Sequence, residues 1–102
     1  MNRIPPNETA FFWRKTKFYV EWTSSWTKNC ETRRNIALVE RTRTELKPFV
    51  VGSYVNVPDL LIKNYGQEYY GGNFERLRQI KAKYDPQNVF NFAQSIPPDY
   101  TR

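Results

Sequence analysis

A helix with clear boundaries is the feature that most limits how this sequence can fold. Gly71 and Gly72 tolerate positive φ angles and end whatever element precedes them. Asn73 is a suitable N-cap, and Pro86 disfavours the α conformation in the residue before it. Between them, apolar residues recur at helical spacing and form one stripe: Phe74, Leu77, Ile80 and Tyr84. The sequence therefore predicts a helix over residues 74–84.

The residues after this helix favour turns. Residues 85–88 read Asp-Pro-Gln-Asn, a combination typical of turns. Residues 89–92 form a short segment that we expect to be extended. Pro97 and Pro98 then prevent further regular structure.

Two aromatic runs near the N-terminus predict an antiparallel hairpin. In residues 9–14, Phe11 and Trp13 would lie on the same face of a strand. In residues 18–23, large apolar side chains alternate with other residues, which is a period of two. Lys15-Thr16 would form the turn, although it lacks the glycine or asparagine that tight turns favour.

Residues 30–46 carry a second helical stripe, formed mainly by Ile36, Val39 and Leu46, and Pro48 ends it. We expect this helix to cover one face of the hairpin's sheet. Residues 60–70 are predicted to form a loop and a short helix. The predicted fold class is thus α+β, with antiparallel strands packed with two or three helices.

Tyr54 and Asn56 are the first pair with chemical potential. In an extended segment, residues two apart point to the same face, so the phenol and the amide would lie side by side. Pro58 would end the strand after this pair. On sequence pattern alone, the preferred interpretation of Tyr54 is a sheet tyrosine whose hydroxyl is satisfied by a neighbour.

Composition excludes several kinds of site. The chain of 102 residues has no histidine and one cysteine, Cys30, which we expect to be a buried and inert thiol. Catalysis by Ser-His-Asp or Cys-His groups and histidine-ligated metals are therefore excluded within this chain, and no metal site is predicted. Its four glycines do not have the spacing of a phosphate-binding loop.

No apolar run is long enough for a membrane span, and no signal peptide is evident, so the expected location is cytoplasmic by default.

The net charge of +6 raises a second kind of function, a small basic α+β module that binds nucleic acid or an acidic protein. A nucleic-acid-binding sheet would carry basic residues beside exposed aromatic ones on one strand face. Here most basic residues fall on the predicted helices. Nucleic acid is therefore not the expected partner.

Four spaced motifs give residues 54–98 a strong resemblance to the C-terminal signature of the berberine-bridge-enzyme-like family of FAD-linked oxidases. They are Tyr54-x-Asn56-x-x-Asp59, Tyr69-Tyr70-Gly71-x-Asn73-x-x-Arg76-Leu77, Ile80-Lys81-x-Lys83-Tyr84-Asp85-Pro86-x-Asn88 and Gln94-Ser95-Ile96-Pro97-Pro98. Residues 10–49 fit the family more loosely. The resemblance implies an FAD-dependent oxidoreductase that acts on an alcohol, a sugar or an alkaloid-like substrate.

The resemblance also implies roles for individual residues. It makes Tyr54 the base that takes a proton from the substrate. A phenol has an ordinary pKa of about 10 and needs a neighbouring charge or hydrogen bond to do so. Asn56 would orient the tyrosine or contact the flavin. Asn91 and Gln94 are further candidate cofactor contacts, because amides can bond the ring atoms of a flavin. For Asn88, turn structure is the preferred interpretation, and for Asn91 and Gln94 the two interpretations stay open.

Three departures from the family pattern limit what this chain could do alone. The family's flavin-binding domain precedes the region matched here, the chain has no histidine to tether FAD, and Cys30 lies outside the tethering motif. We therefore expect a C-terminal piece of a larger flavoenzyme fold, inactive alone, with FAD bound mainly by an N-terminal flavin-binding domain in cis or in trans. Residues 1–53 would belong to the substrate domain, as a hairpin and a helix, and residues 54–102 would form the berberine-like segment.

Overall fold

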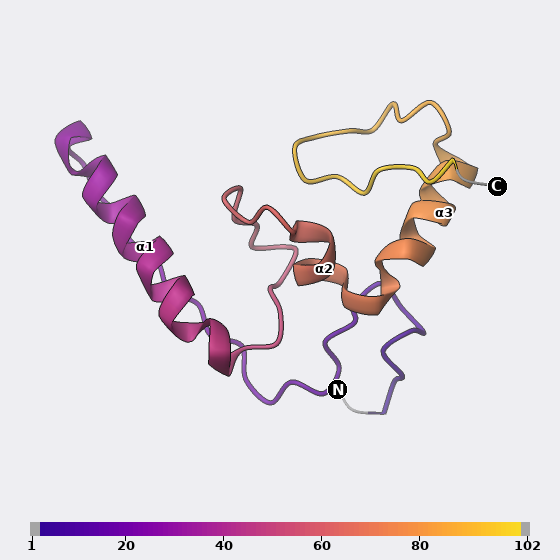
Figure 1. Cartoon of the computed structure of the whole chain (residues 1–102), viewed down its shortest axis with the longest axis horizontal. Coiled ribbons are helices and arrows are strands. Elements are labelled where there is room, and N and C mark those ends of the chain that lie inside the picture. Colours follow the sequence, from indigo (N-terminus) through magenta and orange to yellow (C-terminus); the bar gives the residue numbers. More distant parts are fainter. Residues whose placement is uncertain (1–2, 101–102) are drawn as a thin grey trace. The chain divides into compact units, whose positions relative to one another are not determined.

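The computed structural model describes residues 3–100, and Figure 1 shows the course of the chain. Three α-helices form in this range: α1 (Thr32–Leu46), α2 (Tyr65–Tyr70) and α3 (Phe74–Tyr84). Short 3₁₀ segments adjoin them at Asn29–Glu31, Lys47–Phe49 and Gly71–Asn73. The chain divides into two compact units, Met1–Lys15 with Gly52–Arg102, and Thr16–Val51. The first unit contains α2 and α3, and the second contains α1.

The predicted α+β class is wrong, because no β-strand forms anywhere in residues 3–100. The two halves of the predicted hairpin fall in different units, residues 9–14 in the first and residues 18–23 in the second, and neither half forms a strand. A lone two-stranded hairpin is marginally stable, and the Lys15-Thr16 step lacks the residues that would nucleate it. Alternating aromatic residues specify a strand only where another strand supplies the backbone partners.

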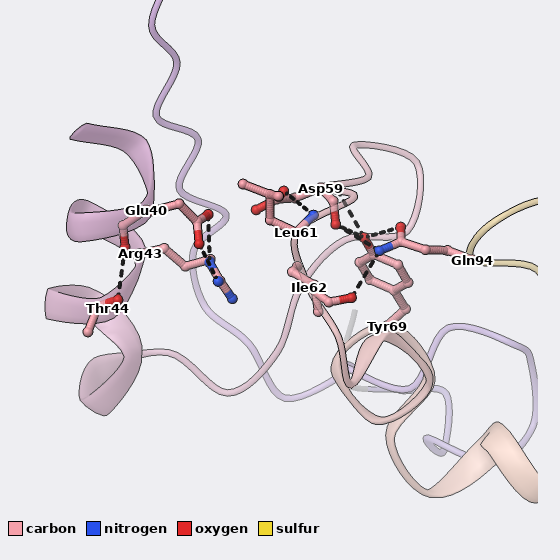
Figure 2. A network of polar contacts seen from close by, with 8 residues as sticks. All are labelled: Glu40, Arg43, Thr44, Asp59, Leu61, Ile62, Tyr69 and Gln94. Atoms are coloured by element: carbon pink, nitrogen blue, oxygen red, sulfur yellow. Dashed lines mark hydrogen bonds and ion pairs between the residues drawn. The ribbon is translucent and has the colours of Figure 1, made fainter. Parts of the chain in front are cut away.

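The helix predicted over residues 30–46 is confirmed as α1, with its first turn replaced by the 3₁₀ segment Asn29–Glu31. Its surface carries ion pairs between residues one turn apart, from Arg41 to Glu45 at 2.7 Å and from Arg43 to Glu40 at 2.8 Å. Figure 2 includes the second pair. The preceding segment is tied to α1 by hydrogen bonds to its first turns, such as Trp26 Nε1 to Thr32 Oγ1 at 2.8 Å. The expected sheet beneath α1 is not present in the described residues.

Helices α2 and α3 pack through aromatic rings. The rings of Tyr70 and Phe74 are stacked with centroids 6.1 Å apart, and Tyr65 meets Phe74 edge-on at 6.3 Å. Gly66 allows this approach, because a Cβ atom there would lie 2.4 Å from the Phe74 ring. The predicted break is confirmed at Gly71, which has a φ of 51° and directly follows the end of α2.

The helix predicted over residues 74–84 is confirmed as α3, and its C-terminal residue is followed by Asp85 in a non-helical conformation. The role predicted for Asn73 is wrong. Asn73 occupies the N-cap position, but its side chain makes no capping hydrogen bond. Instead the buried amide donates to the carbonyl oxygens of Pro6 at 2.7 Å and Thr9 at 2.9 Å. The residue thereby attaches the N-terminal segment to the start of α3.

Little of the apolar surface is buried in the described residues. Only Ile62 and Tyr69 are buried among the large apolar side chains. Of the α3 stripe, Phe74 and Leu77 are half-buried, whereas Ile80 is 42% exposed and Tyr84 is 76% exposed. Cys30, expected to be buried, is exposed. Within residues 3–100, no helix is both long enough and apolar enough to span a membrane.

Candidate functional site

Tyr54 and Asn56 lie in a turn and not in the extended strand predicted for them. The backbone N–H of Val57 donates to the carbonyl oxygen of Tyr54 at 3.0 Å, which closes the turn. Within it, the Asn56 side chain bends back and its Nδ2 donates to the Tyr54 hydroxyl at 2.9 Å. Tyr54 is 40% exposed and Asn56 is also exposed, so this phenol–amide pair is accessible.

The ring of Tyr54 is supported from one side by the N-terminal segment. Phe11 contacts it edge-on, with centroids 6.1 Å apart and ring planes at 89°. The guanidinium carbon of Arg14 lies 5.1 Å from the centroid of the Phe11 ring, close enough for a cation–π contact. The ring of Tyr54 is thus held while its hydroxyl receives the Asn56 amide.

Hydrogen bonds from α2 secure the chain on both sides of the turn. Before it, the backbone N–H of Ser53 donates to the Glu68 carbonyl oxygen at 2.8 Å, and the same oxygen accepts the indole N–H of Trp13 at 3.0 Å. After it, the backbone N–H of Asp59 donates to the Tyr69 hydroxyl at 3.0 Å. Glu68 and Tyr69 are neighbours in the last turn of α2.

A buried amide completes the second of these attachments, as Figure 2 shows. Oε1 of Gln94 accepts the hydroxyl hydrogen of Tyr69 at 3.0 Å. Nε2 of Gln94 donates to two backbone carbonyl oxygens, those of Asp59 at 2.8 Å and Ile62 at 3.1 Å. Both amide hydrogens of Gln94 are therefore engaged within the chain.

The four predicted site residues are thus only partly brought together. Tyr54 and Asn56 are in direct contact, and Gln94 is linked to their turn through Asp59. Asn91 lies elsewhere, in the loop after α3, where its Nδ2 donates to the carbonyl oxygen of Asn88 at 2.9 Å. The sequence interpretation missed Tyr69 as the link between Gln94 and Asp59, although Tyr69 stands in the Tyr-Tyr-Gly motif.

Two side chains of this unit have shifted pKa values. Burial raises the pKa of the Tyr70 phenol, and the neighbouring phenols of Tyr69 and Tyr65 add to the effect. The hydrogen bond from Lys81 lowers the pKa of the Asp85 carboxyl, and the backbone N–H groups of Val89 and Phe90 act in the same direction. Asp85 therefore stays ionised and holds the loop that follows α3.

The donor set suits one edge of a flavin ring better than a whole FAD. Asn56 and Asn91 are exposed amides that could face ring carbonyls and nitrogens. The Gln94 amide hydrogens are committed to backbone carbonyls, so a flavin contact by this residue would use its oxygen or require the network to open. Among residues 3–100, acidic residues and Cys30 form no group of three that could hold a metal ion.

Comparison with known proteins identifies the part of the chain that contains this site. The profile of the family described as berberine and berberine like matches residues 53–97, which span the Tyr54 turn, α2, α3 and Gln94. We refer to this matched segment as the berberine-like domain. The predicted resemblance is thereby confirmed.

Relatives of the whole chain are FAD-linked oxidoreductases, and the chain matches a small C-terminal part of them. The FAD-linked oxidoreductase YvdP of Bacillus subtilis is 61% identical over 98 residues, which are 96% of this chain and 22% of YvdP. Berberine bridge enzyme-like 17 of Arabidopsis thaliana is 36% identical over 116 residues, with the same coverage of both chains. The chain therefore spans about a fifth of the length of the curated relatives it matches.

A solved structure extends the likeness to the fold. The crystal structure of a glycopeptide hexose oxidase complexed with teicoplanin superposes with a TM-score of 0.76 at 25% identity. The match covers 95% of this chain and 23% of the oxidase. A fold similar to that of this chain is thus found within a larger oxidase.

Proposed function

We propose that this chain serves as the C-terminal part of an FAD-dependent oxidoreductase acting on an alcohol, a sugar or an alkaloid-like substrate, with Tyr54 as its general base. The accessible Tyr54–Asn56 pair in the berberine-like domain carries the proposal. The similarity to FAD-linked oxidoreductases such as YvdP supports the cofactor, and the similarity to the hexose oxidase supports a sugar or another alcohol as substrate.

When FAD is bound, it supplies the acceptor for the hydride that leaves the substrate carbon. The chain's own contribution is to the proton. Once ionised, the Tyr54 phenolate oxygen would take the proton of the substrate hydroxyl and become a phenol again. Before that transfer, the Asn56 N–H would stabilise the negative charge on the phenolate oxygen. Asn56 and Asn91 would face the flavin with their amides.

The remaining part of such an enzyme would cover apolar surface that this chain leaves exposed. Phe90 is 79% exposed and Phe92 is 72% exposed, although the backbone around them is held by hydrogen bonds to Asp85 and Ser95. Large aromatic side chains on an ordered loop suit contact with another apolar surface. The proposed partner is the flavin-binding part of the enzyme, in cis or in trans. The isolated chain would then bind no FAD tightly and turn over no substrate.

The test uses a full-length flavoenzyme: YvdP with its matching C-terminal segment replaced by this chain, here called the chimaera. Tyr54→Phe in the chimaera keeps the ring and removes only the hydroxyl. We expect unchanged flavin content and a rate of flavin reduction by an aromatic alcohol or a hexose that falls about 10²–10⁴-fold, as for loss of a general base. Asn64→Ala, at an exposed side chain that makes no capping bond, is the control. Reduction at the parent rate in Tyr54→Phe would refute the role of Tyr54.

A further inference from the structure

We infer that Tyr69 and Gln94 are positioning residues that set the place of the Tyr54 hydroxyl by fixing the backbone of Asp59. The inference rests on the proposed function of Tyr54, and it concerns two residues that need not touch the substrate or the flavin. It follows from how the chain is attached on either side of the Tyr54 turn.

The two attachments of the turn differ in kind. On the N-terminal side, Ser53 is bonded to a backbone carbonyl, that of Glu68, and most side-chain substitutions would leave this bond in place. On the C-terminal side, the backbone N–H of Asp59 is bonded to a side chain, the Tyr69 hydroxyl. The bond of the Asp59 N–H to α2 therefore depends on one phenol oxygen.

Gln94 fixes that phenol and also the carbonyl group of Asp59. The Tyr69 hydroxyl accepts from the Asp59 N–H at 3.0 Å. It donates to Gln94 Oε1 at 3.0 Å, and the Asp59 carbonyl oxygen is a second possible acceptor at 3.3 Å. Nε2 of Gln94 returns to the Asp59 carbonyl oxygen at 2.8 Å. Both polar backbone groups of Asp59 are thus held, by residues that are themselves buried.

Five residues, 54–58, lie between the two attachments, and they contain the whole turn. Release of Asp59 would loosen the C-terminal attachment of the turn to α2 and leave the bond from Ser53 to Glu68 in place. The Tyr54 ring would keep its contact with Phe11, but the closure of the turn and the approach of Asn56 would loosen. Because a shift of about 1 Å in a reacting group can lower a rate about 10²-fold, this looseness matters for proton transfer.

The first test uses the chain itself and needs no cofactor. Tyr69→Phe removes the hydroxyl and keeps the ring. In ¹H–¹⁵N NMR spectra we expect faster hydrogen exchange of the Asp59 and Val57 amides, and a shift of the Asn56 side-chain amide signal toward that of a free asparagine. Tyr65→Phe is the control. It also removes a hydroxyl from α2, but the Tyr65 hydroxyl donates to the carbonyl oxygen of Ser95 at 2.9 Å and not to Asp59 or Gln94. Unchanged Val57 and Asn56 signals in a folded Tyr69→Phe chain would overturn the inference.

The second test separates positioning from catalysis in the chimaera. Tyr69→Phe should lower the rate of flavin reduction about 10- to 100-fold and change the substrate dissociation constant little. The pH profile of reduction should keep its shape, because the base is still present, whereas Tyr54→Phe should lose one limb. If Tyr69→Phe reduces its flavin at the parent rate while Tyr54→Phe is slow, Tyr69 is not a positioning residue, and the proposed function of Tyr54 still stands. A parent rate in both variants would refute the proposed function, and the NMR result would then decide whether the turn is held as inferred.

A second variant tests the inference if the Tyr69→Phe protein does not fold. Gln94→Met keeps the length of the side chain and removes its hydrogen bonds to Asp59 and Tyr69. It should produce the same NMR changes at Val57 and Asn56 as Tyr69→Phe. Parent-like signals at both positions in the folded Gln94→Met chain would overturn the inference as well.

Discussion

The side chain of Asn73 donates a hydrogen bond of 2.7 Å to the carbonyl oxygen of Pro6, 67 positions earlier in the sequence. Its second amide hydrogen reaches the carbonyl oxygen of Thr9 at 2.9 Å. The first residue before α3 thus holds the segment that leads to Phe11, whose ring contacts Tyr54.

Asn73→Ala should therefore destabilise the protein by about 1–3 kcal/mol, because two partly buried carbonyl groups lose their donors. Chemical denaturation measures the loss. Limited proteolysis should in addition cut residues 3–10 faster in the variant. Asn64→Ala is the matched control, since Asn64 is the exposed N-cap of α2 and its side chain makes no capping bond. Equal stability of the two variants would show that Asn73 contributes nothing through Pro6 and Thr9.

The sequence could not reveal that the Asn73 side chain bonds to distant parts of the chain. Its type and position favour capping, a local role, and the Gly71-Gly72 pair before it supported that interpretation. The actual partners lie more than 60 residues away. Tyr69 and Gln94 repeat the case at a separation of 25 residues. A local sequence pattern does not show which distant carbonyl groups need a hydrogen-bond donor.

The helices, by contrast, were predictable because their signals are local. α1 and α3 each combine an apolar stripe with a proline just beyond the end, and both end where Pro48 and Pro86 predict. The strands depended on partners outside their own segments, and the prediction failed there. For Tyr54 and Asn56 the expected proximity is found, although a turn and not a strand produces it.

Leu77→Ala tests how deeply α3 is buried in the chain alone. The apolar stripe by itself suggests a buried residue and a loss of about 2–4 kcal/mol. Leu77 is only half-buried in the structure, so we expect a smaller loss, about 1–2 kcal/mol. Ile80→Ala, at a side chain 42% exposed, should cost less than Leu77→Ala. Denaturation with urea measures both, and the reverse order would mean that α3 presents a different face to its unit.

Asp85 should make the stability of the chain depend on pH. The hydrogen bond from Lys81 lowers the pKa of this carboxyl in the folded protein below its ordinary value near 3.8. A lowered folded pKa means that the stabilisation is fully present above the unfolded pKa and is lost as the pH falls through the folded pKa. The free energy of unfolding should therefore decline below about pH 4, and Asp85→Asn should flatten this part of the curve. Glu45→Gln, at an exposed ion pair, is the control, and a curve of unchanged slope in Asp85→Asn would contradict the prediction.

Phe90 tests whether another surface covers the loop after α3. Its side chain is 79% exposed while its backbone N–H is bonded to Asp85 at 3.0 Å, so the loop is ordered without the help of the ring. Phe90→Ser in the chain alone should thus change the free energy of unfolding by less than about 0.5 kcal/mol.

In the chimaera the same substitution should cost much more if the flavin-binding part packs on this loop. Loss of a fully covered phenylalanine side chain destabilises a protein by about 3–5 kcal/mol, and partial coverage gives a proportionate share. The melting temperature should fall and flavin should be released earlier on heating, whereas Gln87→Ser, in the exposed turn just before the loop, should change neither. A Phe90→Ser chimaera as stable as its parent would mean that this loop faces solvent in the whole enzyme. The Tyr54 proposal would be untouched by that result, because it depends on the turn, α2 and Gln94 and not on the Phe90 side chain.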